Sequence, residues 1–160
     1  MTDRTRDDDE EEEASPASPR SVTLLPEQTL TFDPAGGKPP DFVLADPGAY
    51  EIGNAKVGTL YVRVSAASLP PNATLEVGVR PVINVPASDS TSREVIVSGG
   101  PLCSVAINAS TGASPRVYTA RFEPSSPPGS GLAGYLALNG AGPTSKGSIT
   151  LSVDLILRDC

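Results

Sequence analysis

Apolar and polar residues alternate along almost the whole chain from Ser21 to Asp159. The last stretch shows the pattern most clearly, because every second residue from Ile149 to Leu157 is apolar and most of the residues between them are polar. A two-residue period is typical of an antiparallel strand with one buried face and one solvated face. No segment shows a convincing 3.6-residue period, although a single helical turn would fit near Asp46–Gly48 or Ala66–Leu69. The pattern predicts an all-β protein.

The alternating stretches are short, and the segments between them are rich in Pro, Gly, Ser and Asn, which favour turns. We predict strands at Val22–Leu25, Leu30–Asp33, Phe42–Leu44, Tyr50–Ile52, Thr59–Ser65, Thr74–Val82, Glu94–Val97, Leu102–Asn108, Arg116–Glu123, Leu132–Leu138 and Ser148–Arg158. Strands at this spacing without helices indicate an antiparallel β-sandwich, and the long loops favour a jelly-roll or Greek-key type. A chain of 160 residues has the length of one domain, so we predict a single β-sandwich domain over residues 21–160.

Residues 1–20 have a different composition from the rest of the chain. They hold eight acidic residues and three arginines, a net charge of −5, whereas residues 21–160 carry only −2 of the total of −7. Seven consecutive carboxylates repel one another, so we predict a disordered or extended acidic N-terminal arm. The arm is either a solvated tail or a segment that becomes ordered against a basic partner surface or a neighbouring subunit. Contiguous carboxylates lack the spaced ligands and the turn glycine of a calcium loop.

The charge pattern and the hydropathy also limit the partners and the location of the protein. Lysine and arginine are scattered, whereas phosphate recognition needs them clustered, so we expect no nucleic-acid partner. The first residues contain no apolar core of a secretory signal, and no apolar stretch is long enough to cross a membrane. We therefore expect a protein that is made in the cytoplasm and has no membrane partner.

The two cysteines do not form a disulfide framework. Cys103 falls in the apolar pattern with Val105 and Ile107, which is typical of a buried cysteine acting as a small hydrophobic residue. Cys160 is the last residue, and a bridge between the two cysteines stays open at this stage.

The sequence offers little catalytic chemistry. The chain has no histidine, which excludes a Ser-His-Asp or Cys-His arrangement and imidazole metal ligands. The glycine-containing segments 98–100 and 139–142 lie between predicted strands, which favours turns over phosphate loops. Only a two-carboxylate glycosidase remains formally possible, with Glu76 and Asp154 as outward-facing acids, although such acids are usually just solvated. We predict that the protein is not an enzyme and has no catalytic residue, no cofactor and no metal site.

Several outward positions are unusually apolar for a solvated face. Tyr61 is the aromatic residue that the alternation places on an outer face, and Ile156 interrupts the polar side of the last strand. Tyr135 belongs to a strand that is apolar on both sides, which indicates either a central strand covered by loops or a contact patch. The partner-contact residues that we predict are Tyr61, Tyr135, Ile156 and the seven acids of the arm, Asp7, Asp8, Asp9, Glu10, Glu11, Glu12 and Glu13.

This overall plan resembles the small head-decoration (cement) proteins of tailed bacteriophages. The resemblance lies in the polar arm at residues 1–20, in the all-β body rich in Ala, Gly, Pro, Ser and Val, and in the absence of a signal peptide and of catalytic residues. It implies a non-enzymatic structural protein that binds the major capsid protein or another virion subunit and reinforces the shell. It also implies a homo-oligomer, commonly a trimer, located on the capsid surface of the virion.

Other functions fit the same pattern. A tail, neck or fibre-associated virion protein would share these features. A ligand-binding β-sandwich, such as a carbohydrate-binding or adhesion module, would need a platform of exposed aromatic residues, and the chain has only four Tyr, three Phe and no Trp. An enzyme that uses only carboxylates would need two acids roughly 5–10 Å apart in a cleft.

Overall fold

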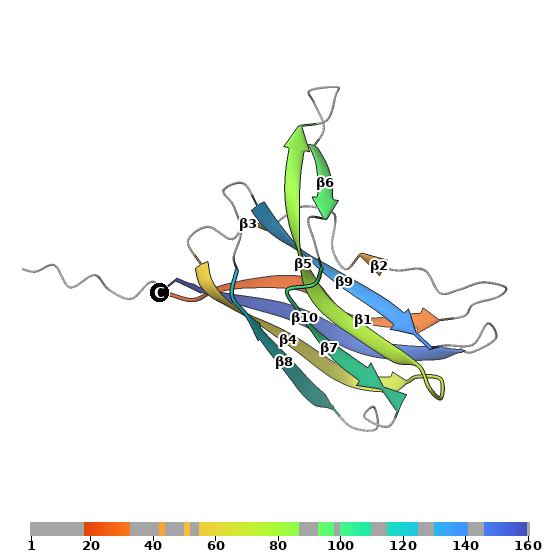
Figure 1. Ribbon diagram of the computed structural model, residues 1–160. Helices are drawn as coiled ribbons and strands as arrows, with labels where there is room; N and C mark the ends of the chain where they lie inside the picture. Colours follow the sequence, from red (N-terminus) through yellow and green to blue (C-terminus); the bar gives the residue numbers. More distant parts are fainter. Residues whose placement is uncertain are drawn as a thin grey trace, which may run out of the picture.

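Figure 1 shows a computed structural model of the chain, which describes residues 18–32, 42–43, 50–51, 55–86, 93–97, 100–109, 115–124, 130–140 and 146–159. These residues contain ten β-strands and no α-helix, which confirms the all-β prediction. The strands are β1 (Arg20–Phe32), β2 (Phe42–Val43), β3 (Tyr50–Glu51), β4 (Ala55–Ser68), β5 (Thr74–Pro86), β6 (Arg93–Val97), β7 (Cys103–Asn108), β8 (Arg116–Phe122), β9 (Ser130–Asn139) and β10 (Gly147–Asp159).

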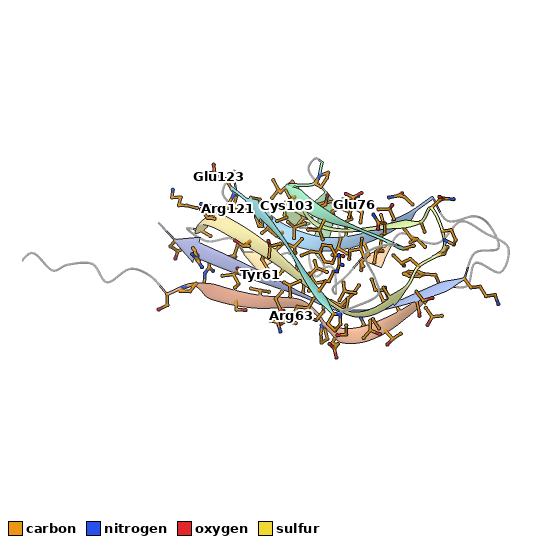
Figure 2. The ribbon with its side chains drawn as sticks, turned by 90° about the horizontal axis from the view of Figure 1, so that it is seen from below. Tyr61, Arg63, Glu76, Cys103, Arg121 and Glu123 are labelled. Atoms are coloured by element: carbon orange, nitrogen blue, oxygen red, sulfur yellow. The ribbon has the colours of Figure 1, made fainter. Side chains whose placement is uncertain are left out.

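The strands form two antiparallel sheets that lie over one another as the two layers of a sandwich (Figures 1 and 2). Sheet A has the order β1-β10-β4-β8. Sheet B has the order β2-β9-β5-β6, with β3 also beside β9 and β7 also beside β5. When β2 and β3 are counted as one strand, and β6 and β7 as another, the chain has eight strand positions, numbered here in chain order. Sheet A then has the order 1-8-3-6, and sheet B has the order 2-7-4-5. This is the strand order of a jelly roll, so the predicted fold is confirmed.

The core lies between the two sheets and is almost entirely aliphatic. On β10, Leu151, Val153 and Leu155 are fully buried, while the residues between them are partly exposed. Sheet B contributes the alternate residues Leu75 and Val77 of β5, which are also fully buried. The alternation in the sequence therefore marks which side of each strand faces the other sheet.

Strand β1 is longer than the sequence predicts, because it joins two predicted strands into one. Its pairing with β10 shifts register between Thr23 and Leu25 and again between Leu25 and Gln28. Pro26 lies in this irregular part and has no N–H to donate to a ladder, so the alternation breaks there although the strand continues.

The connection from β4 to β5 carries the chain from sheet A to sheet B. The Ala73 N–H donates to the carbonyl oxygen of Pro70 at 3.0 Å, and Asn72 adopts a left-handed φ of 67°. Residues 66–68 belong to β4, so the helical turn considered near Ala66–Leu69 is wrong. The other such position, Asp46–Gly48, lies outside the described residues.

Candidate functional site

The outward-pointing residues of sheet A form an exposed face of the described fold. We call it the open face, and it consists of the outward-pointing residues of four segments: Ser21–Thr31, Val57–Arg63, Val117–Arg121 and Ser148–Arg158. Every one of these outward side chains is at least partly exposed, whereas the alternate residues face the core. Most of them are threonine or serine, so the open face is polar but carries few charges.

Three larger side chains with apolar surface gather on the open face. Ile156 lies opposite Thr59 of β4, and Tyr61 lies two residues further along β4, so two of the predicted partner-contact residues are diagonal neighbours. Both are partly exposed. Val117 of β8 is the third, and its 61% exposed side chain is the most exposed large hydrophobic residue described. Val117 is not among the contact residues predicted from the sequence.

Hydrogen bonds and one ion pair hold several polar side chains of the open face in position. Asp154 accepts a hydrogen bond from the Thr23 hydroxyl at 2.9 Å and pairs with the Arg63 guanidinium at 3.4 Å. The Ser65 hydroxyl donates to Glu27 at 2.7 Å. Tyr61 and Arg63 project from neighbouring outward positions of β4 (Figure 2). A face whose side chains are already ordered loses less conformational entropy when it binds a partner.

The outer side of sheet B is different, because its central aromatic residue is covered. Tyr135 is only 6% exposed and lies opposite Gly78, which leaves room for its ring. The Arg80 guanidinium stacks 4.0 Å from the centre of the ring, and the Tyr135 hydroxyl donates to the Glu76 carboxylate. Burial raises the pKa of Tyr135 to about 12, and the hydrogen bond to Glu76 acts in the same direction. Tyr135 thus offers little surface to a partner and ties β9 to β5.

The structure separates the two outward acids that a carboxylate enzyme would need. Glu76 lies on the outer side of sheet B, whereas Asp154 lies on the outer side of sheet A. Packed sheets are roughly 10 Å apart, and here the core fills the space between them. Each carboxylate is also engaged locally, Glu76 by Tyr135 and Asp154 by Thr23 and Arg63. The two acids therefore do not form the paired site of a glycosidase.

The remaining candidates for chemistry or targeting are few in the described part of the chain. No group of three or more His, Cys, Asp or Glu residues lies together there as a metal site would require. Cys103 is a free thiol packed against the core, and burial raises its pKa to about 11, which keeps it protonated at neutral pH. Cys160 and the acidic run Asp7–Glu13 lie outside the described residues. The described part of the chain contains no helix that is long and apolar enough to span a membrane.

We expect Tyr135→Phe to lower the free energy of unfolding by about 1–2 kcal/mol, because it removes the hydroxyl that donates to Glu76 and keeps the ring that packs on Arg80. Urea unfolding followed by circular dichroism measures this difference. The control is Tyr61→Phe, which changes a hydroxyl on the open face and should leave the stability within about 0.5 kcal/mol. Equal losses in the two variants would contradict a structural role for the Tyr135 hydroxyl.

Comparisons with known proteins are sparse. No protein-family model and no curated protein matches the chain. Among solved structures, a VP2 subviral particle of infectious bursal disease virus has a TM-score of 0.29 and 13% identity, over 90% of this chain and 42% of that chain. The structure of the Gx strain of the same virus has a TM-score of 0.28 and 12% identity, over 91% of this chain and 42% of that chain. The chain spans less than half the length of these viral proteins.

Proposed function

We propose that this protein is a non-enzymatic structural protein of a virus particle, and specifically a decoration (cement) protein that binds the surface of the shell and stabilises it. The observation that carries the proposal is the open face of sheet A. It is a broad, ordered and weakly charged surface with exposed Val117 near one edge. Val117, Tyr61 and Ile156 are close to one another on this face, and exposed apolar residues that lie together are typical of a protein–protein contact.

The jelly-roll topology supports the proposal by analogy. Jelly rolls are found in viral capsid proteins as well as in lectins and cupins, so the fold admits the role without specifying it. A shell protein needs a rigid body that places its contact surfaces precisely. The continuous aliphatic core and the long central strands β4 and β10 supply that rigidity.

The arrangement of the aromatic residues favours a structural role over a carbohydrate-binding module. Sugar platforms present exposed aromatic rings. Here Phe32, Phe122 and Tyr135 are buried, and Tyr118 points toward the core side of β8. Tyr61 is partly exposed and has no aromatic neighbour opposite it, because its partners across the strands are Asp154 and Thr119.

The acidic run Asp7–Glu13 completes the proposal as a second contact. It would extend from the body across a neighbouring subunit. Its carboxylates would there exchange their contacts with water for ion pairs with basic residues. A segment that orders on binding covers a large area at the cost of its own entropy. Many copies on one particle would multiply weak contacts.

The test is reconstitution on virus particles that lack the protein. We expect the purified chain to bind such particles to saturation, at a fixed ratio to the major shell protein, and to raise the temperature at which the particles release their genome. A variant without residues 1–19 should bind more weakly but still bind. Absence of the protein from native particles, together with no binding to depleted ones, would overturn the proposal.

A further inference from the structure

We infer that, in the free protein, the acidic run Asp7–Glu13 binds one end of sheet A in its own chain. We call this surface the basic end, and it consists of Arg20, Lys56, Arg121 and Arg158. The inference concerns the protein before it meets a shell, so it goes beyond the proposed function. Only one consequence rests on that function, namely that the run leaves its own chain when it contacts a neighbouring subunit.

The basic end takes one residue from each of the four strands of sheet A. Arg20 is the first residue of β1, and the register places Lys56, Arg121 and Arg158 each within two residues of its level. All four side chains are exposed. Figure 2 shows Arg121 at the same end of the sandwich as the start of β1. The basic residues therefore gather where residues 1–19 join the body.

The acids at this end do not neutralise the basic residues. Asp159 pairs with Arg20 at 3.9 Å, and Glu123, one residue after β8, is the other acid nearby. Among the described residues, the other three members of the basic end form no ion pair. Three exposed cations are therefore available to carboxylates from elsewhere.

The distribution of charge along the chain makes the acidic run the complementary partner. Residues 1–19 hold eight acids and two arginines, a net charge of −6. The strands of sheet A hold six basic and three acidic residues, whereas those of sheet B hold two basic and three acidic residues. The run is therefore attracted to sheet A rather than to sheet B. In the middle of sheet A, Arg63 already pairs with Asp154, so the unpaired cations of the basic end are the better partners.

The connection between the run and the body has a suitable length. Six residues, 14–19, separate Glu13 from Arg20, and an extended chain of that length spans about 20 Å. With about 4.8 Å between strands, sheet A is about 14 Å wide from β1 to β8, so the run can reach all four basic residues. A short tether holds the run near the surface at a concentration on the order of millimolar, so several weak exposed ion pairs can act together.

The experiment is cross-linking of the full-length protein with a carbodiimide, which joins a carboxylate to a lysine amine only where the two are in contact. The chain has three lysines, Lys38, Lys56 and Lys146, and only Lys56 belongs to the basic end. We expect mass spectrometry to identify cross-links from the run to Lys56 within one chain, at a yield that does not depend on protein concentration. The yield should fall by about threefold or more in about 1 M salt, which screens exposed ion pairs.

Charge reversal tests which residues hold the run. Arg121→Glu and Arg158→Glu should each lower the yield of the Lys56 cross-link by about threefold or more, because each replaces an attracting charge with a repelling one. The matched control is Arg116→Glu, which makes the same change at an exposed residue at the other end of β8 and should leave the yield unchanged. Circular dichroism and thermal unfolding of each variant show whether the fold is retained.

The outcomes separate this inference from the proposed function. Cross-links between two chains in place of those within one would show that the run binds another copy, which overturns the inference. A run that reacts with Lys56 no more than with Lys146 also overturns it, as do equal losses in all three variants, because net charge alone would then explain them. Binding to depleted particles is measured separately on the wild type. A protein that binds them without the Lys56 cross-link keeps the proposed function, and one that forms the cross-link without binding particles keeps only the inference.

Discussion

Leu155→Ala should lower the free energy of unfolding by about 3–5 kcal/mol, the upper range for a leucine truncated in a well-packed core. Leu155 is fully buried on β10, the strand between β1 and β4, and lies level with Val22 on one side and Leu60 on the other. Loss of its side chain would leave a cavity at the centre of sheet A. Typical domains are stable by about 5–15 kcal/mol, so the variant should be close to unfolding at 37 °C.

Urea unfolding measures the difference, and the next residue provides the control. Ile156 follows Leu155 on the same strand but points to the open face, where it is partly exposed. Ile156→Ala should therefore cost about 1 kcal/mol or less. Similar losses in the two variants would mean that the register of β10 is not the one described here, because a slip of one residue exchanges the buried and exposed sides.

This pair of residues also shows how much of the fold could be predicted from the sequence. The alternation on β10 assigned Leu155 to the core and Asp154 to the solvated side, and both are found there. The same holds for Leu75 against Glu76 on β5. Burial of alternate residues is a local property of one strand, so a local pattern is sufficient to predict it.

The pairing of the strands could not be predicted in the same way. Arg20 pairs with Leu157 at the opposite end of the chain, and no local pattern encodes that partner. The continuity of β1 across Pro26 was also missed, because proline removes a donor and usually ends a ladder. In this sheet the proline falls at a bulge on an edge strand, where the missing N–H costs no pairing.

The candidate contact residues were predicted individually and were grouped only by the topology. Tyr61 and Ile156 were each expected to point outward, but only the pairing of β4 with β10 brings them together. For Tyr135 the sequence predicted only a strand that is apolar on both sides, either covered by loops or part of a contact patch, and the residue lies buried on the outer side of sheet B. Its burial depends on Arg80 and Glu76, which lie diagonally across β5, so the sequence of its own strand carries no sign of it.

Gly58→Ala should lower the free energy of unfolding by about 2–3 kcal/mol, although it adds a single methyl group. Gly58 lies on the core side of β4, directly opposite Phe122 of β8. A Cβ atom at Gly58 would lie 2.1 Å from the Cζ atom of the Phe122 ring and 2.5 Å from its Cε1 atom. Phe122 is only 5% exposed, so its ring has little free space into which it could move.

A double-mutant cycle shows whether contact with the Phe122 ring causes the loss of stability in Gly58→Ala. Phe122→Leu removes the ring atoms that meet the new methyl group, so the combined variant should be more stable than the sum of the two single losses by at least about 1 kcal/mol. Additive losses would mean that the cost of Gly58→Ala has another origin, such as the backbone of β4.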